Sequence, residues 1–173
     1  MHSDRLALQC AREEADLDEP ENNLFGPVSR RVRRVHRGRR RRHAEHFLEL
    51  VEQAEPHILG GTLGTPWMRR LEREWGNLRA AMEWCAEDEE GAEAELRFGA
   101  ALHWFHFALS RFKEPRERLQ RALERAEGAS PALRGRSLAT VGYLAFWMGD
   151  HEAMRVSLEA SVALLRGQGA PTD

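Results

Sequence analysis

Apolar side chains recur every three or four positions along most of the chain, which is the spacing that places them on one face of an α-helix. The pattern is sharpest between Thr65 and Ala86. Thr65 suits the N-cap position, and Pro66 suits the first turn, where a missing N–H group costs nothing. We therefore predict one amphipathic helix from Thr65 to about Ala86, whose buried face consists of Trp67, Met68, Leu71, Trp75, Leu78, Met82 and Cys85.

The same spacing predicts further helices on either side of this one. They are expected at about residues 40–55, 92–109, 114–126 and 131–149, and after Asp150. No segment alternates apolar and polar residues between hairpin turns, as a half-buried strand would. We therefore predict an all-α fold whose last four helices form two antiparallel hairpins.

The N-terminal part of the chain differs from the rest. Residues 1–38 lack sustained periodicity and are interrupted by Pro20 and by Gly26-Pro27. Residues 1–29 hold seven acids and two arginines, a net charge of −5, whereas residues 30–42 hold nine arginines and no acid, a net charge of +9. We predict a disordered or marginally helical tail over residues 1–38, followed by a helical domain over residues 39–168.

Composition places the chain in a broad class. The 173 residues carry a net charge of −2, and the two cysteines lie in unrelated contexts, so a disulfide framework is not expected. No apolar run approaches the roughly 18 residues of a membrane span, and the acidic N-terminus is unlike a signal peptide. We expect a cytoplasmic protein with no membrane partner.

The second predicted hairpin keeps the spacing of the tetratricopeptide consensus. Gly142 is the small residue that would let the two helices approach closely, and Gly149-Asp150 would form the tight turn between them. In the first hairpin only Leu102, Leu119 and Ala122 match well. We therefore predict antiparallel hairpins stacked as a tetratricopeptide-like α-solenoid. The matching positions of the second hairpin are Leu138, Val141, Gly142, Ala145, Met154, Leu158 and Ser161.

A second resemblance is carried by three segments. They are Arg41-Arg42-His43-Ala44-Glu45-His46-Phe47, Trp67-Met68-Arg69-Arg70-Leu71-Glu72, and Glu74-x-x-Asn77-Leu78-Arg79-Ala80-Ala81-Met82-x-Trp84. They resemble the helical region that follows the ATPase domain in bacterial STAND-class regulators, which are signal-transducing ATPases of the LuxR and antibiotic-regulator type. The resemblance covers about residues 40–168 and implies tetratricopeptide-like repeats that serve transcriptional regulation.

Other parts of such regulators are missing from this sequence. There is no GxxxxGK[ST] motif, because the only lysine, Lys113, lies in Arg-Phe-Lys-Glu-Pro. No helix-turn-helix follows the repeats. The resemblance therefore implies a sensor portion without the ATPase and DNA-binding domains. The alternative is a truncated fragment of a larger regulator, with no independent function.

Candidate chemistry is sparse. The pairs His43/His46 and His103/His106 each place two imidazoles one helical turn apart, but neither has a thiol or carboxylate partner at ligand spacing. We interpret them as packing residues and expect no metal. No serine or cysteine lies in a nucleophile motif, so we expect neither catalysis nor a cofactor. Five tryptophans are interpreted as core residues, namely Trp67, Trp75, Trp84, Trp104 and Trp147.

The arginine run offers a second kind of function. Clustered positive charge gains binding energy on phosphate backbones through counterion release. Aromatic residues do not interleave this run, and the acidic segment before it could neutralise it, so we do not expect this chain alone to bind nucleic acid. A nucleic-acid-binding adapter remains the alternative, with phosphate contacts from Arg33, Arg34, Arg37, Arg39, Arg40 and Arg41.

These observations predict a non-catalytic protein-interaction or signal-sensing scaffold. Its protein or peptide partner would bind the concave side of the hairpins, lined by helices 92–109 and 131–148. Self-association is also expected, because fewer than three clear repeats leave one edge open. The candidate partner-binding residues are His103, His106, Arg136, Thr140 and Tyr143.

Overall fold

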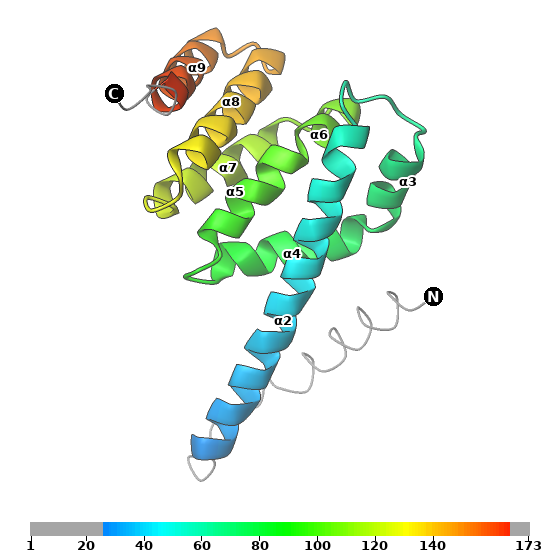
Figure 1. Cartoon of the computed structure of the whole chain (residues 1–173), viewed down its shortest axis with the longest axis vertical. Helices are drawn as coiled ribbons and strands as arrows, with labels where there is room; N and C mark the ends of the chain where they lie inside the picture. Colours follow the sequence, from blue (N-terminus) through cyan, green and yellow to red (C-terminus); the bar gives the residue numbers. More distant parts are fainter. Residues whose placement is uncertain (1–25, 167–173) are drawn as a thin grey trace, which may run out of the picture. The chain divides into compact units, whose positions relative to one another are not determined.

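The computed structural model describes residues 26–166, with side chains from Val35 onward. Every regular element in this range is a helix, as predicted (Figure 1). None of the described helices is long and apolar enough to cross a membrane. The elements are α2 (Gly26–Ala54), the short 3-10 helix η1 (Glu55–His57), α3 (Pro66–Arg73), α4 (Trp75–Glu87), α5 (Ala92–Ala101), α6 (His103–Ala108), α7 (Lys113–Arg125), α8 (Pro131–Trp147) and α9 (His151–Arg166).

The chain divides into two compact units, residues 1–41 and 42–173. In the first unit the described backbone is helical from Gly26 onward, so helix begins inside the predicted tail. Arginine is a good helix former, and proline at position 27 falls in the first turn, where it is tolerated. The rest of the tail prediction falls on residues 1–25, outside the described range. The description below concerns residues 42–166 of the second unit.

Two of the predicted helices are each divided by a single residue. The helix predicted from Thr65 to Ala86 is interrupted at Glu74 (φ −89°, ψ 6°), and the helix predicted over 92–109 is interrupted at Leu102 (φ −87°, ψ 5°). The backbone hydrogen bonds continue through both sites: the N–H group of Glu74 donates to Arg70, and Leu78 donates back to Glu74, at 3.0 and 2.9 Å. Because these bonds keep the i to i−4 pattern of an α-helix, the spacing of apolar residues is unchanged across each interruption. The sequence pattern therefore does not reveal either interruption.

Two groups of buried apolar side chains hold the second unit together. One joins the end of α2 to α3, α4, α5 and α6, and the other joins α5, α7 and α8. Arg97 on α5 also donates two hydrogen bonds of 2.8 Å to the Glu52 carboxylate on α2. The apolar side of this end of α2 is buried, since at most 4% of the surface is exposed at Phe47, Leu48, Val51 and Ala54.

Side-chain caps fix three helix starts where the sequence predicts them. Thr65, Ser130 and Asp150 each accept a hydrogen bond from the N–H group three residues later, at 3.1–3.3 Å. Such caps satisfy backbone donors that have no partner inside the helix. Gly149 forms the turn before Asp150 with φ +76°, a conformation that other residues rarely adopt.

Helices α8 and α9 lie side by side at unusually close range (Figure 1). A Cβ atom at Gly142 would lie 2.8 Å from Leu158 Cγ, and one at Gly135 would lie 2.8 Å from Leu165 Cγ. The Ser161 hydroxyl donates to the carbonyl oxygen of Gly135 at 2.7 Å. Leu158 and Leu165 of α9 thus pack against Gly142 and Gly135 of α8, with a spacing of seven residues in both helices. The prediction that Gly142 allows the two helices to approach closely is confirmed.

Two glycines allow the same substitution to be tested with opposite expected signs. A Cβ atom at Gly91 would lie 2.1 Å from the backbone oxygen of Cys85, whereas one at Gly76 would meet nothing within 4 Å. We expect Gly91→Ala to lower the free energy of unfolding by about 1–3 kcal/mol, because the clash is with backbone and cannot relax by a rotamer change. Gly76→Ala should raise it by about 0.5–1 kcal/mol, because alanine favours helix.

Urea unfolding followed by circular dichroism measures both variants. Equal effects of the two substitutions would contradict the close approach of the α4–α5 connection to the end of α4.

Candidate binding surface

A row of aromatic rings, two of them exposed and two partly buried, lies across α6 and α8. His103 and Phe107 are four residues apart on α6, and Tyr143 and Trp147 are four residues apart on α8, so each pair shares one side of its helix. The ring centroids of His103 and Tyr143 are 5.4 Å apart, and those of Phe107 and Trp147 are 5.0 Å apart. Tyr143 and Trp147 are about half exposed, at 51% and 50%. We call these four residues the aromatic face.

The structure separates the five predicted partner-binding residues. Tyr143 and Arg136 are exposed, and His103 is partly buried beside Tyr143. Arg136 forms an ion pair with Glu55, the first residue of η1. His106 and Thr140 are buried, with 5% and 6% of their surface exposed, so their side chains are not offered to a partner.

Local packing accounts for the two buried residues. The ring of His106 turns toward α4 and packs edge-on against Trp75, with 5.7 Å between centroids. The Thr140 hydroxyl donates to the carbonyl oxygen of Arg136 within α8, at 3.2 Å. Helical spacing alone places Thr140 between Arg136 and Tyr143, and only the packing of the helices shows that it is covered.

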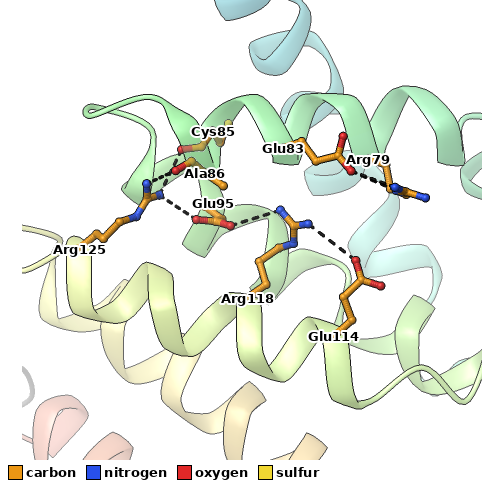
Figure 2. A network of polar contacts seen from close by, with 8 residues as sticks. All are labelled: Arg79, Glu83, Cys85, Ala86, Glu95, Glu114, Arg118 and Arg125. Carbon is orange, nitrogen blue, oxygen red and sulfur yellow. Dashed lines mark hydrogen bonds and ion pairs between the residues drawn. The ribbon is translucent and has the colours of Figure 1, made fainter.

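A buried carboxylate joins three helices below the surface (Figure 2). Glu95 on α5 is 3% exposed and accepts from Arg118 at 3.4 Å and from Arg125 at 2.8 Å, both on α7. Arg125 also donates to the carbonyl oxygens of Cys85, at 3.2 Å, and of Ala86, at the end of α4. One carboxylate and two guanidinium groups therefore connect α4, α5 and α7.

The electrostatics of this network indicate a structural role. Burial raises the pKa of Glu95, and the positive charges of Arg118 and Arg125 act against that rise. Burial, together with the nearby carboxylates of Glu95 and Asp88, raises the pKa of the Cys85 thiol to about 12. A thiol that stays protonated at neutral pH is a poor nucleophile. The charges here bind helices to one another, and the buried Cys85 thiol stays protonated.

The two histidine pairs make aromatic contacts. His43 and His46 lie 4.7 and 5.0 Å from the ring of Phe47, and burial lowers the pKa of His43. Within the described residues, no group of three or more histidine, cysteine, aspartate or glutamate side chains is placed to hold a metal ion.

The arginine run is only partly described. The side chains of Arg37, Arg39, Arg40 and Arg41 are exposed, and those of Arg33 and Arg34 lie outside the description. These residues belong to the first unit, so nothing relates them to the aromatic face. Phosphate contact by this run stays a prediction.

The sequence alone did not identify most of this surface. Trp147 was predicted to lie in the core, yet half of its side chain is exposed, because it follows the side of α8 that carries Tyr143. The only signal was the repeat of aromatic residues four positions apart in both helices. Comparison of the chain with protein-family models, curated proteins and solved structures gave no match.

Proposed function

We propose that this chain is a non-catalytic protein-interaction or signal-sensing scaffold whose aromatic face binds an extended segment of a partner protein. Half-exposed rings of Tyr143 and Trp147 carry this proposal. Tyrosine and tryptophan dominate the binding energy of many interfaces because they bury a large area with few rotatable bonds. Single exposed apolar residues are ordinary, whereas a contiguous row indicates a contact surface.

The helices beneath the aromatic face support the same proposal. The glycine contacts between α8 and α9 and the Glu95 network hold the rings on closely packed elements. Side chains positioned in this way lose little conformational freedom on binding.

The proposed architecture is a stack of tetratricopeptide-like hairpins, of which α8–α9 is the clearest. The proposed context is that of the helical region in STAND-class transcriptional regulators, in which such hairpins receive a signal. The α8–α9 packing and the resemblance of residues 40–168 support these two proposals. Self-association through the open edge remains a prediction, and Val156, Val162 and Leu165 are its exposed apolar residues on α9.

The proposal is tested by selecting binders from a library of random twelve-residue peptides and measuring their affinities by fluorescence anisotropy. We expect Tyr143→Ala and Trp147→Ala each to lower the affinity of the chain for the selected peptides roughly tenfold or more, as truncation of an interface anchor does. Melting temperatures should change little, because both side chains are half exposed.

Val156→Ala is the matched control, since Val156 is 51% exposed on α9 and makes no described ring contact. It should leave the affinity unchanged. The proposal fails if selected peptides bind the Trp147→Ala variant as tightly as the unaltered chain, or if the library yields no binder.

A further inference from the structure

An open pocket lies beyond the aromatic face, between α4 and the start of α7. Its volume of about 570 Å³ falls within the range of ligand sites in proteins, roughly 300–1,000 Å³. Figure 2 shows two of its residues, Arg79 on α4 and Glu114 on α7. The lining residues are Trp75, Arg79, Ser110, Arg111, Phe112, Lys113, Glu114, Pro115 and Met148.

Positive charge predominates in this pocket. Arg79, Arg111 and Lys113 contribute three cations, against the single carboxylate of Glu114. Arg79 is paired with Glu83 on its own helix at 3.0 Å, and Glu114 lies 3.8 Å from Arg118. The two remaining cations, Arg111 and Lys113, have no ion pair in the described part of the chain.

Arg111 is held in place without losing its charge. Its guanidinium carbon lies 5.0 Å from the ring centroid of Trp75, so the cation rests over an aromatic ring and not beside a carboxylate. Lys113 is the first residue of α7, and the N-cap residue Phe112 provides no side-chain hydrogen bond to that helix. The partial positive charge of an uncapped helix N-terminus adds to that of the two side chains.

A small cavity beside His106 shares part of its lining with the open pocket. His106 lines an enclosed cavity of about 20 Å³, enough for one water molecule. The walls of this cavity include Trp75, Arg111, Glu114 and Pro115, which also line the open pocket. The Nδ1 atom of His106 is buried and has no hydrogen-bond partner within the described residues. Trp75 and Arg111 thus belong to the walls of both cavities.

The apolar walls of the pocket continue into the aromatic face. Phe112 stacks on Trp147 with 6.5 Å between centroids and 19° between ring planes, and Met148 follows Trp147 on the other wall. The lining of this pocket therefore combines cations with apolar side chains.

We propose that this pocket binds a carboxylate group of the partner segment, next to an apolar side chain that continues onto the aromatic face. The proposal rests on the proposed function, because it names the chemistry of the same partner. Arg111 and Lys113 supply charge-assisted hydrogen bonds, which are stronger than neutral ones. The carboxylate is either an aspartate or glutamate side chain or the free C-terminus of the partner.

The test uses the selected peptides, resynthesised with free and with amidated C-termini and with each acid replaced by its amide. We expect Lys113→Glu to weaken binding roughly tenfold or more, since it removes one charged contact and introduces repulsion. The binding should also weaken as salt is added. Replacement of the peptide carboxylate by lysine should restore affinity for the Lys113→Glu variant.

Arg69→Glu is the matched control, because it makes the same change in net charge at an exposed position of α3 outside the pocket. It should leave peptide affinity unchanged. Lys113→Glu itself should fold, because an acid in the first turn of a helix is favourable.

The outcomes separate the two proposals. Loss of binding on amidation assigns the pocket to a C-terminus, and loss on replacing an acid by its amide assigns it to a side chain. If Trp147→Ala lowers the affinity for the peptides and Lys113→Glu leaves it unchanged, the proposal that the pocket binds a carboxylate is wrong. The proposed function is then still supported. A library that yields no binder overturns both.

Discussion

Replacing Glu95 by alanine is expected to lower the free energy of unfolding by about 3–5 kcal/mol, as the removal of one partner from a buried ion pair does. Glu95 is 3% exposed, and Arg118 and Arg125 are largely enclosed, with 16% and 35% of their side chains exposed. Without the carboxylate, Arg125 has no ion pair left within the described residues and Arg118 retains only the exposed Glu114, 3.8 Å away, while both guanidinium groups remain partly out of water. The ion pairs between α5 and α7 are lost in the same step, and the apolar contacts between the two helices remain.

Glu93 provides the matched control for this substitution. It lies in the same first turn of α5 but is exposed, so Glu93→Ala should change the stability by less than about 0.5 kcal/mol. Urea unfolding of both variants, followed by circular dichroism at 222 nm, measures the difference. Equal losses for the two would contradict the burial of Glu95. A variant carrying leucine at both Glu95 and Arg118 should recover part of the loss, because it leaves fewer buried charges without partners.

Acid is expected to destabilise the protein through His106. Burial, the nearby positive charges of Arg111 and Arg118, and the neighbouring His103 lower the pKa of His106 from 6.5 to about 3. Below pH 6.5 the unfolded chain takes up a proton on this imidazole that the folded chain does not accept. The contribution of the neutral His106 to the free energy of unfolding is therefore fully present above pH 6.5. It is lost progressively as the pH falls from 6.5 toward 3.

The magnitude follows from the shift. Each pH unit between the two pKa values corresponds to about 1.4 kcal/mol, so the loss is about 2 kcal/mol at pH 5 and about 4–5 kcal/mol at pH 3. The measurement is urea unfolding at pH 7.5, 5 and 4, compared with that of His106→Phe, which keeps a ring among Trp75 and Phe105.

The comparison with His106→Phe isolates this one group. Burial also lowers the pKa of His43 and His103, which adds to the loss in acid, and the raised pKa of Glu95 has the opposite effect. All three contributions remain in the variant and cancel in the difference. If the unaltered chain and His106→Phe lose stability equally between pH 7.5 and 5, then His106 is not buried as described.

The resemblance to the helical region of STAND-class regulators concerns the biological context of the protein. The binding experiments concern the way in which a partner segment is bound. The resemblance proposes a context in which a signal is received. The aromatic face and the open pocket between α4 and α7 are the basis for a proposal of how a partner segment is held, by the rings and by Arg111 and Lys113. Peptide selection tests the second independently of the first.

The sequence by itself determined the helices. Apolar spacing identified the buried faces, and the local signals at Thr65, Ser130 and Asp150 placed three helix starts correctly. Gly142 was also identified correctly, because a residue without a side chain on an apolar helix face indicates the close approach of another helix. These features depend on residues within a few positions of one another, which is why a one-dimensional pattern records them.

Only the tertiary structure decided which polar residues are buried and which aromatic residues are exposed. Glu95 is one of two acids in the first turn of α5, and no sequence pattern distinguishes it from the exposed Glu93, but α7 brings Arg118 and Arg125 to it from more than twenty positions along the chain. Trp147 sits on an apolar helix, yet the contacts of its ring with Phe107 and Phe112 leave half of its side chain exposed. Burial depends on which elements pack together, and the periodicity of a single helix cannot specify its neighbours.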